Sequence, residues 1–208
     1  MTDIINLFYK WQTLIGSILG GIFALCVALI VGHAVRRREE LSSGMLLIAE
    51  LMNVRIAFET LIALAEKENI SEDDYPFWFA GKLTGSFPKL SPLFEASIVR
   101  MMPINTYLAA HLTLFHKIHT KLQMHIERII EDFRLHNQGE LTRPKDQLKA
   151  DARIIQKHYP IAVQHAKCSE QLISDFVLSK FPTWHRLRKA VRLRPDEKDC
   201  IKYLTEGS

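Results

Sequence analysis

The sequence predicts an all-α protein with one N-terminal transmembrane helix followed by an up-and-down bundle of three long helices with short accessory helices. Residues 14–35 form an apolar stretch that contains no Asp, Glu, Lys or Arg. Downstream, apolar residues recur at the three- and four-residue spacings of an amphipathic helix in three stretches, 47–65, 104–133 and 148–176. Because such stripes are buried against one another, they favour a helical bundle.

This pattern divides the chain into four segments. They are a short interfacial N-terminus at 1–13, a transmembrane helix at 14–35, a cytoplasmic helical bundle at 36–194 and a polar C-terminal tail at 195–208. The part that follows the span is long enough for one helical domain with its own core. Three cysteines at irregular spacings do not form a disulfide framework, and they favour a reducing, cytoplasmic setting for that domain.

The segment 14–35 has the length and the flanks of an uncleaved membrane anchor. At about 1.5 Å of rise per residue its helix would extend about 33 Å, which matches the hydrocarbon core of a bilayer. The aromatic residues Phe8, Tyr9 and Trp11 precede this segment. The positively charged residues Arg36, Arg37 and Arg38 follow it. A cleaved signal peptide would carry its positive charge before the apolar stretch. The arginines predict a cytoplasmic C-terminal domain and an N-terminus outside.

Small residues recur at every fourth position of the predicted span. They are Gly16, Gly20, Ala24, Ala28 and Gly32, called the ridge below. Small side chains let a second helix approach closely in lipid, so the ridge predicts a homodimer or a partner membrane helix. The competing interpretation is that Gly is simply frequent in membrane helices.

The first predicted helix of the bundle begins almost directly after the span. Its apolar stripe consists of Leu47, Leu51, Val54, Phe58, Leu61 and Ala65. Residues 42–44, Ser-Ser-Gly, are predicted to form a hinge before it. Residues 69–91 are rich in Pro, Gly and aromatic residues, and we interpret them as a lid over one end of the bundle, with a binding mouth as the alternative. Ser71 and Asp74 resemble a capping box within this segment.

Proline and glycine mark the ends of the later helices. Ser91 and the proline after it predict a short helix over 93–102, and a long helix is expected over 104–136 with Gly139 at its C-cap. A third long helix is expected from Pro144, with a kink or break at Pro160. A short amphipathic helix is expected over about 183–194.

One stretch carries a resemblance to known sequences. The segment FPKLSPLFEASIVRMMPINTYLAAHLTLFHKIH, together with Trp11 and Gln12 ahead of the span and Pro103 between a short and a longer helix, resembles uncharacterised bacterial single-pass inner-membrane proteins with a cytoplasmic helical domain. The resemblance implies a location in a bacterial inner membrane. It implies no activity and no functional residue.

Histidines are the first candidates for chemistry. Five of them fall on the predicted helix 104–136, namely His111, His116, His119, His125 and His136. At about 100° per residue they spread around the helix rather than converge. Two pairs with i, i+3 spacing, His116 with His119 and His165 with Cys168, could each supply two metal ligands. No further ligand is evident from another helix, so the sequence predicts no metal site and no other cofactor.

A basic amphipathic segment near the C-terminus is the best candidate for a binding surface outside the span. Its candidate contact residues are Lys180, Trp184, Arg186, Arg188, Lys189, Arg192 and Arg194. Such a segment tethered near a bilayer could contact an anionic leaflet. The alternatives are that its apolar side docks on the bundle, or that it meets nucleic acid or an acidic partner.

The absence of catalytic motifs in the sequence favours a non-enzymatic role. There is no glycine-rich phosphate loop, no GxSxG and no HExxH, and the formal charge of +4 is too small to indicate nucleic acid. We therefore expect a membrane-tethered interaction or regulatory module. The alternative is a small membrane-associated helical enzyme or metal-binding protein that uses the histidine-bearing helix 104–136.

Overall fold

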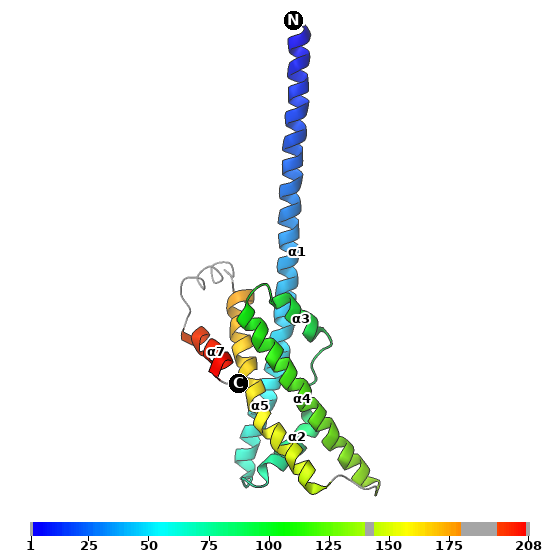
Figure 1. The fold of residues 1–208 in the computed structure, drawn as a ribbon, viewed down its shortest axis with the longest axis vertical. Helices are drawn as coiled ribbons and strands as arrows, with labels where there is room; N and C mark the ends of the chain where they lie inside the picture. The colour runs from blue at the N-terminus through cyan, green and yellow to red at the C-terminus, as the bar shows by residue number, and fades with distance from the viewer. Residues whose placement is uncertain (1, 140–143, 180–194, 207–208) are drawn as a thin grey trace. The chain divides into compact units, whose positions relative to one another are not determined.

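A computed structural model describes residues 2–139, 144–179 and 195–206 (Figure 1). Within these ranges the regular structure is entirely helical, and no strand is present. The chain divides into two compact units, Met1–Ser42 and Ser43–Ser208. The all-α class and the long apolar N-terminal helix expected from the sequence are thereby confirmed.

The first unit contains the N-terminal part of helix α1, which runs through Thr2–Glu68. Every side chain from 9 to 36 is exposed, and the helix is long and apolar enough to cross a membrane. Its two hydroxyl side chains near residue 15 are satisfied within the helix, because Thr13 Oγ1 donates to the Tyr9 carbonyl and Ser17 Oγ donates to the Thr13 carbonyl, each at 2.9 Å. Such internal hydrogen bonds are what an apolar environment requires of polar groups.

The second unit is built from the C-terminal part of α1 and the helices that follow it. They are α2 (Tyr75–Ser86), α3 (Leu93–Met101), α4 (Thr106–Asn137), α5 (Lys145–Ile173), the π-helical turn η1 (Ser174–Leu178) and α7 (Pro195–Glu206). Helix α4 contacts α5, α3 and α7, while α2 contacts both α4 and α5. The helices α4 and α5 therefore form the centre of this unit.

The core lies where the predicted apolar stripes meet. The stripe on α1 is buried at Leu47, Leu51 and Val54, which are 0% exposed, and Tyr159 of α5 donates from its hydroxyl to the Val54 carbonyl at 3.3 Å. Helix α4 contributes fully buried residues such as Leu112. The helical period of the sequence thus marks the buried faces, except at Phe133 of α4, which is 41% exposed.

Aromatic rings of the segment 69–91 form part of this core. Phe79 is 1% exposed and lies edge-on to Phe58 and to Tyr159, and Phe87 also packs against Tyr159. Ser71 Oγ accepts a hydrogen bond from the Asp74 amide at 3.3 Å, and this bond is one of the two that a capping box contains. The rings of Phe79 and Phe87 thus serve packing, whereas Asp73, Asp74, Pro76 and Phe77 of the same segment line a pocket.

The predicted hinge at 42–44 is a continuous part of α1. Glycine at 44 has a packing role instead: a Cβ at Gly44 would lie 2.9 Å from Val177 Cγ1 and 3.3 Å from Ile173 Cγ2. The absence of a side chain therefore lets α1 approach the end of α5 and η1 closely.

The ends of α4 agree with the sequence to within two residues. Asn105 is the N-cap, and its Oδ1 accepts from the amides of Tyr107 and Leu108 at 2.9 and 3.3 Å. Gly139 follows the last turn with a φ of +75°, the left-handed conformation expected at that position.

Two sequence expectations differ from the structure. Helix α5 continues through Pro160 without a break; Pro160 itself is exposed, and Tyr159 and Ala162 beside it are fully buried. The expected polar tail 195–208 contains helix α7, in which Cys200 is only 5% exposed. Because Cys200 is buried, α7 is docked on the rest of the unit. The polar composition of 195–208 alone did not indicate this docking.

Candidate functional site

The ridge of the predicted span lies on α1 with all five residues exposed. A Cβ added at Gly16, Gly20 or Gly32 would meet no other atom of the described chain within 4 Å. The ridge is thus a surface on which a larger side chain would not disturb the chain itself. The basic segment, with Lys180, Trp184, Arg186, Arg188, Lys189, Arg192 and Arg194, lies outside the described residues.

His116 and His119 of α4 have separate neighbours. His116 stacks on Phe94, with ring centroids 5.8 Å apart. His119 is 1% exposed, and its Nε2 lies 2.9 Å from the carbonyl oxygen of Pro88. Because each ring is used in its own packing contact, the HxxH spacing of His116 and His119 does not build a shared site.

His125 forms a buried polar pair with α5. Its Nδ1 lies 2.8 Å from Asp151 Oδ1, and the two residues are 8% and 7% exposed. A buried imidazole–carboxylate hydrogen bond satisfies both groups, so the pair is best understood as a structural link between α4 and α5.

One cluster does gather chemically active side chains from three helices. His111 comes from α4, His165 and Cys168 from α5, and Cys200 from α7. All four are buried, with exposed fractions of 0 to 5%. The sequence pairs His165 with Cys168 on one face of a helix, but only the tertiary structure adds the other two residues.

The atoms of this cluster are close together. The Nδ1 atoms of His111 and His165 are 2.9 Å apart, and His111 Nε2 lies 3.1 Å from the Cys200 carbonyl oxygen. One ligand atom each from His111, Cys168 and Cys200 fall within 4.8 Å of one another. The Cys200 carbonyl can only accept, so His111 Nε2 donates to it, and His111 Nδ1 accepts from His165 Nδ1–H.

Burial sets the protonation of these side chains. It lowers the pKa of His111 to about 4, with His165 adding to the effect, and it also lowers the pKa of His165. A hydrogen bond with the Cys200 thiol, together with burial, raises the pKa of the Cys168 thiol. In the chain alone the cluster is therefore uncharged at neutral pH, with neutral imidazoles and protonated thiols.

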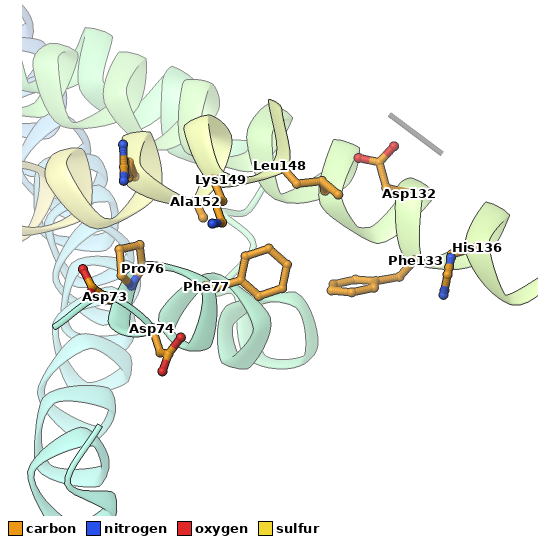
Figure 2. Close-up of a pocket in the computed structure, with 11 residues that line it drawn as sticks. Asp73, Asp74, Pro76, Phe77, Asp132, Phe133, His136, Leu148, Lys149 and Ala152 are labelled. Atoms are coloured by element: carbon orange, nitrogen blue, oxygen red, sulfur yellow. The ribbon is translucent and has the colours of Figure 1, made fainter. Parts of the chain in front are cut away.

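A pocket of about 600 Å³ lies elsewhere in the second unit, between α2, α4 and α5. Figure 2 shows Phe77 and Phe133 at its centre, with Asp73 and Asp74 on one side and Lys149 of α5 on another. The two phenylalanine rings meet edge to face at 6.4 Å. Acidic and basic groups both line the pocket, so its charge does not select one class of ligand.

Comparison of the chain with protein-family models, with curated proteins and with solved structures finds no match.

Proposed function

We propose that the chain is a single-pass protein of a bacterial inner membrane, with residues 14–35 across the bilayer. The N-terminus lies outside, and the part of the chain that follows the arginines forms a cytoplasmic up-and-down bundle of three long helices, on which α7 is docked. Support comes from the exposed apolar side chains along the whole of 14–35, a surface that is unfavourable in water. The arginines at 36–38 support the orientation.

Within the membrane, the protein acts as a non-enzymatic interaction or regulatory module whose span associates with a second copy or with a partner helix. The observation that carries this proposal is the uncovered ridge. Its five small residues are exposed and continuous over four turns of helix. Close approach of two such helices is stabilised by van der Waals contact between their backbones.

The test of association enlarges two ridge residues in the full chain. Gly20→Leu with Ala28→Leu should reduce the signal of a membrane two-hybrid assay, because the larger side chains prevent the close approach of a second helix. Cys26→Leu is the matched control, since this exposed residue lies about 200° around the helix from Ala24. An unchanged signal in the double variant, or an equal loss in the control, would contradict association through the ridge. The span would then serve only as a membrane anchor.

Topology is tested separately with reporter fusions to the full chain. A phosphatase that is active only outside the cytoplasm should be active at the N-terminus and inactive at the C-terminus, and a fluorescent protein should give the opposite result. Recovery of the chain in the soluble fraction after cell lysis would contradict the membrane assignment.

The basic segment is proposed to contact the anionic leaflet beside which the anchor holds it. Each Lys or Arg near such a surface contributes on the order of 1 kcal/mol. Replacing Arg186, Arg188, Lys189 and Arg192 with Gln should weaken the association of the full chain with anionic bilayers. Identical association of the variant and the natural chain would exclude this contact.

A further inference from the structure

We infer that His111, His165, Cys168 and Cys200 bind one Zn²⁺ ion, which fastens helix α7 to α4 and α5. The inference concerns a different part of the molecule from the ridge and is independent of the membrane role. It also differs from the metal-binding alternative considered from the sequence, which relied on the histidines of one helix.

The ligand set is the first argument. Two imidazole nitrogens and two thiolate sulfurs are a complete tetrahedral set for zinc, and such closed sites are structural rather than catalytic. Soft thiolates with imidazoles disfavour Mg²⁺ and Ca²⁺, which take oxygen ligands. The four residues come from three helices, so the ion would join segments that are far apart in the sequence.

The distances fit this coordination with small adjustments. Zinc bonds of about 2.05 Å to nitrogen and 2.3 Å to sulfur place two nitrogens about 3.3 Å apart and two sulfurs about 3.8 Å apart at the corners of a tetrahedron. The Nδ1 atoms of His111 and His165 are 2.9 Å apart. The ligand atoms of His111, Cys168 and Cys200 lie within 4.8 Å of one another. The ligand atoms of His111, Cys168 and Cys200 are therefore at most about 1.3 Å further apart than the corners of the tetrahedron. The His165 ring, in contact with His111, supplies the fourth ligand through a change of its side-chain rotamer.

The hydrogen bond from His111 Nε2–H to the Cys200 carbonyl is the second argument. It fixes the tautomer in which His111 Nδ1 carries a lone pair rather than a hydrogen, and this lone pair accepts the hydrogen bond from His165. Zinc-binding histidines commonly donate their other ring N–H to a carbonyl or carboxylate in this way. The carbonyl belongs to a residue whose own sulfur is a proposed ligand, so one contact orients two ligands.

Charge balance is the third argument. When Zn²⁺ binds, the hydrogen on His165 Nδ1 moves to Nε2 of the His165 ring, so that Nδ1 can coordinate the ion. The two thiols each release one proton. The product, one dication with two thiolates and two neutral imidazoles, has no net charge. A neutral product suits a site whose four side chains are at most 5% exposed, because an uncompensated buried charge is strongly unfavourable.

The consequence is a metal-dependent position for α7. This helix has 12 residues, and an isolated helix of that length is marginal in water. Among the helices described, α7 packs chiefly against α4. Coordination of Cys200 adds a bond to α5 through Cys168 and His165.

The test measures metal in the full chain purified in detergent under reducing conditions. We expect about one equivalent of zinc per chain by elemental mass spectrometry, as a closed structural site binds one ion. Replacement by Co²⁺ should give visible d–d bands of tetrahedral geometry with a thiolate charge-transfer band. Cys200→Ser and Cys168→Ser should each lower the bound metal at least about tenfold.

Matched controls keep the test specific. Cys26→Ser removes the exposed cysteine of the span, and His116→Ala removes a histidine of α4 outside the cluster; both should keep the full metal content. Hydrogen exchange gives an independent readout, because chelation of zinc should accelerate exchange in residues 198–204 of the natural chain and not in Cys200→Ser.

Three results would overturn the inference. One is a natural chain that binds neither zinc nor added Co²⁺ after full reduction, and this measurement needs no variant to fold. Another is metal that stays in Cys200→Ser or is lost in Cys26→Ser. The last is a Cys168–Cys200 disulfide found by mass spectrometry in a chain that, once reduced, still takes up no metal.

Discussion

The close contact at Gly44 gives the sharpest test of how the second unit is packed. A methyl group added there would lie 2.9 Å from Val177 Cγ1 and 3.3 Å from Ile173 Cγ2. Both neighbours are β-branched and buried, so neither can rotate away freely. Overpacking of this kind costs about 1 to 3 kcal/mol.

A second glycine isolates that cost. Gly→Ala inside a helix gains about 1 kcal/mol from helix propensity alone, and this gain opposes the overpacking at Gly44. Gly81 lies inside α2, and a Cβ there meets nothing within 4 Å, so Gly81→Ala should stabilise the unit by about that amount. The free energies of unfolding of Gly81→Ala and Gly44→Ala should therefore differ by about 1 to 3 kcal/mol, with Gly44→Ala the less stable.

The assay is urea unfolding of the full chain in detergent, followed by circular dichroism. The same comparison separates the packing role from a hinge, because a hinge at 42–44 would be stiffened by alanine without loss of stability. If Gly44→Ala stabilised the chain as much as Gly81→Ala does, the contact with Val177 would not exist and the reasoning would be refuted.

Three further predictions concern the core. Burial, which outweighs the hydrogen bond to the Pro88 carbonyl, lowers the pKa of His119 to about 4, with His116 adding to the lowering. As the pH falls, His119 is therefore protonated in the unfolded chain before it is protonated in the folded one. The free energy of unfolding should be highest above pH 6.5 and should fall by about 2 to 3 kcal/mol by about pH 4.5. His119→Gln should lose this part of the pH dependence of unfolding, and an unaltered profile would contradict it. Tyr159→Phe removes the 3.3 Å hydrogen bond to the Val54 carbonyl, which also lies within the hydrogen-bonded backbone of α1, and should lower the free energy of unfolding by about 0.5 to 1.5 kcal/mol; a neutral result in urea titration would show that the bond contributes nothing. Phe79→Ala opens a cavity beside Tyr159 and should cost about 3 to 5 kcal/mol, measured in the same way, whereas a loss below about 1 kcal/mol would place Phe79 outside the core.

The sequence was most informative where one physical rule acts along a single helix. The stripe Leu47, Leu51 and Val54 is fully buried, as its spacing predicted. Asn105 and Gly139 bound α4 because side-chain capping and a left-handed φ are local properties of the chain. The same locality explains the exposed apolar segment 14–35, whose length and lack of charge need no tertiary contact to be recognised.

Prediction from the sequence was incomplete where a residue's role depends on a neighbour far away in the chain. Gly44 looks like a flexible point in the sequence, and only its distance to Val177 shows that it permits a close contact. Pro160 looks like a helix breaker, yet α5 continues through this exposed residue, with Tyr159 and Ala162 beside it buried in the core. Burial of apolar surface contributes more than the loss of one backbone hydrogen bond, and it is decided by the whole unit.

By itself the sequence determined the helical class, the apolar N-terminal segment with its ridge, and the faces of the helices that are buried, because periodicity and composition are properties of single segments. Only the tertiary structure decided that His111, His165, Cys168 and Cys200 meet. Two of them share one face of α5, but His111 and Cys200 arrive from helices whose mutual position depends on packing. A site made by three helices cannot be found from the spacing within any one of them.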